Sequence, residues 1–331
     1  MIDPFSKIVF GIYPGGPAGS NSGLAAGKPD DPAKINEALD HLQGNDRRQL
    51  LVRAYMPFVA HDRKLGVKAT PSSAKQYSDY DVSRQKISQR KLDLVLTFGD
   101  MQGDIEAWSQ FVRKAIRLNA DQLGKVQVTE EPNLVYPPGD GRFPQIAEAV
   151  VEGVIAAREQ VQQLGLDVLV GFNAVQAYES VDPFWERLDA CASDRFRQSL
   201  DYVGVDLFPD VFKPLGDVTM EEAVLYGLSS FRHQLEAIKL AASIPIHVTE
   251  HGWPTSLERS YDHQARVLDE TVRTIAKYQR EFLVSHYEFF SLRDADSYNP
   301  GIFFQFGLLR DDYSPKPAFE VFRQLIAEFG A

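Results

Sequence analysis

The sequence has a single cysteine and fewer positive than negative charges. Cys191 has no second cysteine with which to pair, so an intrachain disulfide is excluded. The 35 lysine and arginine residues are outnumbered by 46 aspartate and glutamate residues, which gives a net charge of −11. Because such a protein repels phosphate groups overall, the composition argues against a nucleic-acid partner and favours a neutral or cationic ligand.

Long apolar runs are also missing. No segment approaches the roughly 18 consecutive apolar residues of a membrane span, so we expect no membrane partner. Residues 1–10 lack the basic start and the apolar stretch of a signal peptide. As it stands, the sequence is therefore expected to be cytoplasmic, or secreted if a signal peptide has been removed.

Short β-rich runs alternate with amphipathic helical stretches along the chain. We expect strands at 8–13, 49–55, 92–98, 126–129, 168–172, 202–207, 246–249 and 284–290, and helices at 32–42, 105–118, 145–164, 221–242, 264–278 and 316–329. This alternation implies parallel strands joined by right-handed crossovers. Eight such units favour a closed barrel over an open sheet. The predicted fold class is α/β, a single (β/α)8 TIM barrel over 1–331, with an elaborated excursion near 61–90 between the second and third strands.

Carboxylate, amide and aromatic side chains concentrate where these strands end. In a barrel, the C-terminal strand ends form the face that carries the active site. The candidates, in chain order, are Arg53, Tyr55, Glu130, Glu131, Asn133, Asn173, Asp206, Glu250, His251, Trp253, Tyr287 and Phe290. Cleavage of a glycosidic bond needs two carboxyl groups: one protonates the leaving oxygen, and the other attacks the anomeric carbon or activates water. Aromatic rings offer flat surfaces for sugar faces.

Two segments resemble the signatures of a known enzyme group. Residues 128–133 read Val-Thr-Glu-Glu-Pro-Asn, and residues 247–254 read His-Val-Thr-Glu-His-Gly-Trp-Pro. They resemble the Asn-Glu-Pro and Thr-Glu-x-Gly-Trp-Pro signatures of the largest clan of retaining (β/α)8 glycoside hydrolases, and the tail over 291–318 is also similar to that clan. The resemblance implies a retaining hydrolase without a cofactor. It implies that Glu131 is the acid/base and Glu250 the nucleophile. It also implies that Arg53 forms a hydrogen bond with the nucleophile.

The acid/base position leaves an alternative open. Glu130 stands where the clan has the Asn that binds the sugar 2-hydroxyl, so Glu130 remains a second candidate for the acid. Strand alternation places Glu131 on the barrel side with Gln127, which favours Glu131. The same count places Glu250 with Val248 on the outer face, unless the strand end bulges.

The expected partner is an oligo- or polysaccharide, and the resemblance favours a β-linked one. A transglycosylase with the same site, a non-catalytic carbohydrate-binding barrel and a metal-dependent barrel hydrolase are the alternatives. His247 and His251 are four residues apart, but they lie on a strand and its loop, where side chains diverge. No third ligand is evident, so we expect no metal site.

Overall fold

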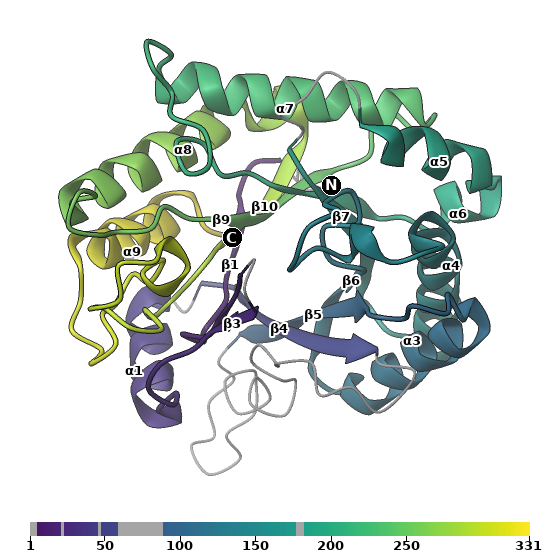
Figure 1. Ribbon diagram of the computed structural model, residues 1–331, viewed down its shortest axis with the longest axis horizontal. Coiled ribbons are helices and arrows are strands. Elements are labelled where there is room, and N and C mark those ends of the chain that lie inside the picture. The colour runs from purple at the N-terminus through teal and green to yellow at the C-terminus, as the bar shows by residue number, and fades with distance from the viewer. Residues whose placement is uncertain (1–4, 21–22, 46–47, 59–88, 177–181) are drawn as a thin grey trace.

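The computed structural model describes residues 5–20, 23–45, 48–58, 89–176 and 182–331. Eight of its strands form a closed parallel barrel in the order β1-β10-β9-β8-β7-β6-β5-β4, with helices around it (Figure 1). These strands are β1 (Val9–Ile12), β4 (Leu50–Phe58), β5 (Arg90–Phe98), β6 (Leu123–Val128), β7 (Leu169–Val175), β8 (Tyr202–Asp206), β9 (Ile246–His251) and β10 (Val284–Phe289). The predicted TIM barrel is therefore confirmed.

The helices begin at residues whose side chains or backbone suit a helix start. They are α1 (Pro32–Gln43), α3 (Ile105–Asn119), α4 (Ile146–Leu164), α5 (Pro183–Cys191), α6 (Asp194–Gln198), α7 (Met220–Ala237), α8 (Tyr261–Phe282) and α9 (Pro317–Phe329). Proline opens α1, α5 and α9, where its missing N–H costs nothing. Thr219 and Glu222 form a reciprocal capping box at the start of α7.

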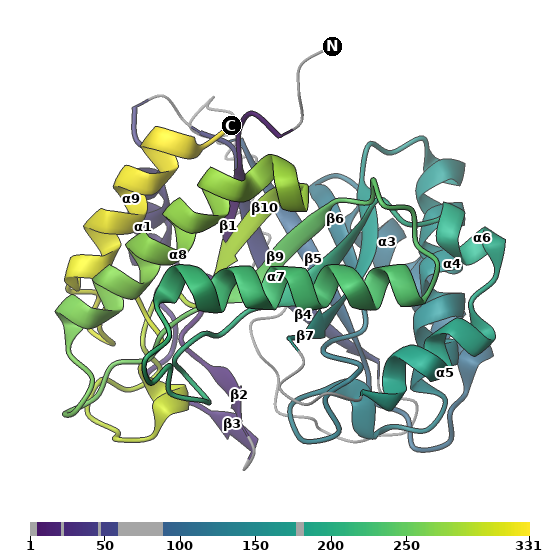
Figure 2. The ribbon, with the colours of Figure 1, turned by 90° about the horizontal axis from the view of Figure 1, so that it is seen from above.

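Four elements were not expected from the sequence. Helices α5 and α6 follow β7, and a small antiparallel hairpin of β2 (Ala18–Ser20) and β3 (Gly23–Ala25) follows β1. Figure 2 shows this hairpin on the side of the barrel opposite the C-terminus, and this side is the C-terminal face of the strands. The excursion predicted near 61–90 lies outside the described residues except for its last two, and Arg90 already begins β5.

Alternation along the strands separates an apolar layer from a polar barrel interior. On β5, Leu92, Leu94 and Leu96 pack in the core between strands and helices, where each contributes ~1.5–3 kcal/mol by burial. Asp93 lies between them in sequence and points the other way, into the barrel. None of the helices among the residues that the structure describes is long and apolar enough to cross a membrane.

The end of β9 carries a bulge. Val205 of β8 pairs with Val248, but the next residue, Asp206, pairs with Glu250, so one extra residue of β9 lies between them. The pairing with β10 shows the same shift, because Val248 faces Tyr287 and the second residue beyond it, Phe289, faces His251. The bulge lets Thr249 and Glu250 both point into the barrel, which resolves the parity conflict in the sequence.

Candidate functional site

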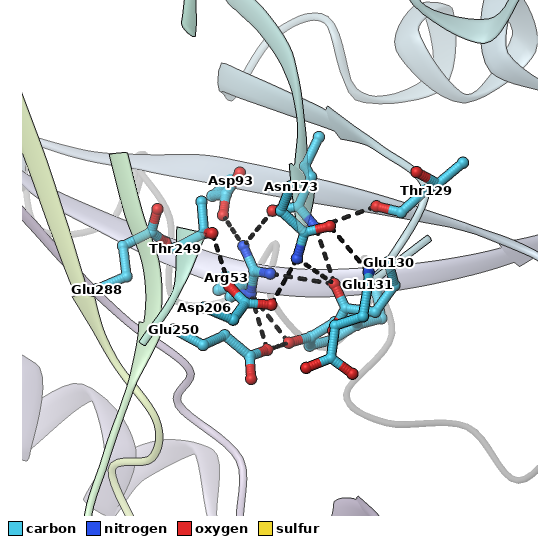
Figure 3. A network of polar contacts seen from close by, with 12 residues as sticks. Arg53, Asp93, Thr129, Glu130, Glu131, Asn173, Asp206, Thr249, Glu250 and Glu288 are labelled. Carbon is cyan, nitrogen blue, oxygen red and sulfur yellow. Dashed lines mark hydrogen bonds and ion pairs between the residues drawn. The ribbon is translucent and has the colours of Figure 1, made fainter. Parts of the chain in front are cut away.

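A buried guanidinium lies at the centre of the candidate site. Arg53, on β4, is 1% exposed. It donates to Asp93 Oδ2 at 2.7 Å, to Gln127 Oε1 at 3.1 Å and to Glu130 Oε2 at 3.3 Å. Its Nε donates to the Tyr55 hydroxyl at 2.9 Å. These contacts tie strands β4, β5 and β6 together beneath the C-terminal mouth (Figure 3).

The carboxylate of Glu250, on β9, reaches the same guanidinium. Its Oε1 lies 3.4 Å from Arg53 Nε and accepts a hydrogen bond from the Tyr55 hydroxyl. Burial raises the pKa of Tyr55 well above its usual value, so the phenol keeps its proton and remains a donor. The Arg53 cation and the Tyr55 donor together hold the orientation of the Glu250 carboxyl group.

The two glutamates after β6 have different surroundings. Glu130 Oε2 accepts from Gln127 Nε2 at 2.8 Å, from Arg53 and from Asn173 Nδ2 at 3.4 Å. Asp140 accepts the Glu130 backbone N–H at 2.9 Å and so anchors this turn. The Glu130 carboxylate is therefore part of the internal network.

Glu131 is held by its backbone instead. Its N–H donates to Asn173 Oδ1 at 2.9 Å, and its φ of 45° turns the chain sharply after Glu130. Figure 3 shows its carboxyl group pointing away from Arg53, at the same edge of the network as the carboxyl group of Glu250. Glu131 is 8% exposed and Glu250 is 6% exposed, compared with 2% for Glu130. The Glu131 carboxyl group thus lies at the mouth, directed away from Arg53.

Asp206, at the end of β8, lies between Asn173 and Thr249. It accepts from Asn173 Nδ2 at 2.6 Å and from Thr249 Oγ1 at 2.7 Å. Burial, together with the negative charges of Glu250 and Glu130, raises the pKa of Asp206 well above its usual value.

A second layer of charge lies deeper in the barrel, and the sequence analysis did not identify it. Lys125 of β6 forms an ion pair with Glu288 of β10 and lies 3.5 Å from Asp93, which links the pair to Arg53. All three side chains are fully buried. Burial and the neighbouring Asp93 raise the pKa of Glu288 to about 8, although Lys125 acts in the opposite direction. These residues could have been identified from the sequence, because they are charged side chains at inward positions of otherwise apolar strands.

Several predicted site residues lie away from this network. Asn133 bonds both backbone groups of Val175 and also Asp182, so it joins the loops after β6 and β7. Trp253 is 4% exposed, donates to Asp210, and has the guanidinium of Arg259 4.4 Å from its ring centre. Both side chains connect loops at the mouth, and their contact with a ligand stays a prediction.

Phe290 lies at the mouth, whereas His251 and Tyr287 lie outside the barrel interior. Phe290 is stacked on Tyr13, with ring centres 5.2 Å apart, and belongs to a small apolar cluster at the mouth. His251 and Tyr287 contact each other in the core outside the barrel, where Tyr287 packs near Phe322 of α9. The expected sugar contact of these two residues is wrong, because the bulge in β9 turns His251 outward.

His251 gives a prediction for stability. Burial lowers its pKa from 6.5 to about 3, so the unfolded chain binds a proton here that the folded chain does not between those values. The stability that depends on neutral His251 is complete above pH 6.5 and is lost as pH falls towards 3. Relative to His251→Asn, the wild type should lose about 1.4 kcal/mol of unfolding free energy per pH unit in this window, measured by urea unfolding. Parallel pH dependences of the two proteins would contradict the buried neutral imidazole.

Comparisons with solved structures find the same barrel in glycoside hydrolases. A family 39 glycoside hydrolase from Bacteroides cellulosilyticus WH2 superposes with a TM-score of 0.61 at 15% identity, over 98% of this chain and 64% of that one. GH5_18 from Bifidobacterium longum gives 0.64 at 14% identity, covering 98% and 80%. A fungal β-1,4-galactanase gives 0.60 at 11% identity, covering 96% and 99%.

The sequence itself matches none of the protein-family models and none of the curated proteins with which it was compared. This chain spans 64% of the length of the family 39 enzyme. At identities of 11–15%, the likeness is one of fold. The chain therefore has the (β/α)8 barrel fold that these glycoside hydrolases share.

Proposed function

We propose that this protein is a retaining glycoside hydrolase, with Glu250 as nucleophile and Glu131 as acid/base. The observation that carries the proposal is the contrast between two carboxyl groups at one mouth. Glu250 is held beside Arg53 and Tyr55, whereas the Glu131 carboxyl group points away from that cation. A nucleophile must stay ionised, and an acid must be able to carry a proton, so this contrast suits the two roles.

The reaction has two displacements. In the first, a Glu250 oxygen attacks the anomeric carbon while the glycosidic C–O bond breaks and Glu131 gives its proton to the leaving oxygen. In the second, Glu131 takes a proton from water, whose oxygen attacks the same carbon and releases Glu250. Two inversions at one carbon give net retention.

The substrate is inferred to be a β-linked oligo- or polysaccharide. The fold is shared with enzymes that include a β-1,4-galactanase, and the signatures at Glu131 and Glu250 resemble the same clan. The site is acidic, with Glu130 and Glu250 beside Arg53 and the Glu131 carboxyl group pointing away from it, which favours sugars without negative charge.

The direct test is a panel of β-linked oligosaccharides and aryl β-glycosides, with the first-formed product anomer assigned by proton NMR. We expect the β-anomer to appear first. First appearance of the α-anomer would mean inversion. Saccharide binding without turnover would favour the non-catalytic barrel, and products longer than the substrate would favour transglycosylation.

The choice between Glu131 and Glu130 can be tested by chemical rescue. Glu131→Ala should lower kcat by about 10²–10⁴-fold for poor leaving groups, since general acid catalysis is lost. With an activated aryl glycoside, added azide should restore turnover and yield a β-glycosyl azide, because the small anion enters the vacated space and attacks without a base. Glu130→Ala is the matched comparison, and we expect no azide product from it. Rescue of Glu130→Ala but not of Glu131→Ala would exchange the two assignments.

A further inference from the structure

Asp206 lies between the two segments that carry the proposed catalytic carboxyl groups. Its Oδ1 accepts from Thr249, which directly precedes Glu250 on β9. Its Oδ2 accepts from Asn173 on β7, and the Oδ1 of that amide accepts the backbone N–H of Glu131. Three hydrogen bonds in series therefore join the Glu131 backbone to Thr249, the residue before Glu250, through the Asp206 carboxyl group (Figure 3).

The surroundings of Asp206 leave this path little freedom. Asp206 is 1% exposed, and Asn173 and Thr249 are both fully buried. Gly204, two residues earlier on β8, makes room for both neighbours. A Cβ at Gly204 would lie 2.6 Å from the Thr249 side chain and 3.0 Å from that of Asn173. The backbone adds a further tie, because Leu207 N–H donates to the Glu250 carbonyl at 2.9 Å.

We propose that Asp206 is a positioning residue that sets the separation and orientation of Glu131 and Glu250. The inference rests on the proposed function and replaces the expected sugar contact of Asp206 with an indirect role. Both of its oxygens accept hydrogen bonds within the protein, and the residue is buried beneath the mouth. A misplacement of about 1 Å at reacting groups can cost on the order of 10²-fold in rate, so a rigid bridge matters for kcat.

The first experiment removes the Asp206 carboxyl group, and then separately its hydrogen bond with Thr249 and its hydrogen bond with Asn173. Asp206→Ala should lower kcat by about 10²-fold while KM changes little. Asp206→Asn should retain more activity, since its amide can accept from Asn173 and donate to the Thr249 hydroxyl. Thr249→Val should affect only the position of Glu250. Asn173→Ala should chiefly affect the position of Glu131. These two variants carry the test if Asp206→Ala does not fold.

Substrates with different leaving groups distinguish a displaced nucleophile from a displaced acid. A 2,4-dinitrophenyl glycoside departs with little protonation, whereas a sugar leaving group needs the acid. Thr249→Val should slow both substrates equally, and Asn173→Ala should slow the saccharide more. Thr274→Val on α8 is the matched control. It removes a buried threonine hydroxyl bond, to Glu270, far from this path in the fold, and it should leave kcat unchanged.

The outcomes separate this inference from the function on which it rests. If the wild type is active but Asp206→Ala loses no more kcat than Thr274→Val, or changes KM alone, the positioning role is wrong and the function stands. If the wild type turns over no glycoside, the proposed function fails. Crystal structures of wild type and Asp206→Ala then decide: a shift of either glutamate carboxyl group by about 1 Å supports positioning, and superposable carboxyl groups overturn it.

Discussion

Replacement of Glu250 by glutamine should lower kcat by on the order of 10⁴–10⁶-fold, the range found when a catalytic nucleophile is removed. The amide has nearly the same shape as the carboxylate and can still contact Tyr55, but it cannot form the ester to the anomeric carbon. The barrel should fold normally, because the loss is of one charge at the mouth. Turnover of an aryl β-glycoside, with circular dichroism for folding, measures both.

Glu258→Gln provides a matched control. Glu258 lies exposed in the loop after β9, eight residues beyond Glu250, and the same chemical change there should leave kcat at the wild-type value. If Glu250→Gln keeps more than a few per cent of wild-type activity, Glu250 is not the nucleophile. Equal losses in both variants would point to a general effect of charge on the mouth.

Replacement of Lys125 by methionine should have the largest effect on stability. Lys125 is fully buried, forms an ion pair with Glu288 and lies 3.5 Å from Asp93. Its removal leaves the buried carboxyl groups of Asp93 and Glu288 with Arg53 as the remaining buried cation near them among the described residues. Against the effect of burial, Lys125 and Arg53 lower the pKa of Asp93, so the Asp93 carboxylate is charged at pH 7. Removal of the buried lysine beside it should cost about 3–5 kcal/mol, which urea unfolding at pH 7 would measure.

A control and a pH signature accompany this prediction. Lys91→Met, at an exposed position of the neighbouring strand β5, should change stability by less than about 0.5 kcal/mol. The pKa of Glu288 is raised to about 8, so its contribution to stability is complete below its unfolded pKa and is lost as pH rises to 8. Without Lys125 that pKa rises further, and the deficit of the variant should grow above pH 8. A variant as stable as the wild type would show that the lysine is not needed.

The barrel could be predicted because its signal is local. Apolar alternation within each strand and helical periodicity between strands are visible in short windows of sequence. On β5, the leucines that face the helices and the intervening Asp93 follow the expected period of two. The closing pairs of β1 with β10 and β4 then follow from eight consecutive units of this kind.

The prediction of which side chains face the barrel interior was wrong where that period was broken. One extra residue at the end of β9 turns Glu250 inward and His251 outward, and the sequence contains no signal for the bulge. The expected site role of His251 was therefore wrong, whereas the assignment of Glu250 to the mouth depended on the motif around it. Tyr287, the partner of His251, follows the ordinary alternation of β10 into the outer core.

Contacts between strands that are distant in the sequence could not be predicted either. Arg53 was expected near Glu250, and the structure places their charged atoms 3.4 Å apart. Its partners Asp93 and Glu130, and the pair of Lys125 with Glu288, arise only when the barrel closes and brings inward residues of different strands together. The motif assigned the acid/base to Glu131 and left Glu130 as an alternative, whereas the sharp turn between them, which the sequence did not indicate, determines which carboxyl group enters the network.

The most direct test of the central claim is the trapping of the covalent intermediate. A 2-deoxy-2-fluoro glycoside with a good leaving group slows both displacements but permits the first, so the glycosyl-enzyme accumulates. Mass spectrometry of the digested protein should find one added glycosyl group, on Glu250, and none in Glu250→Gln. A label on Glu131, Glu130 or Asp206, or hydrolysis that proceeds with inversion and leaves no label, would contradict the account.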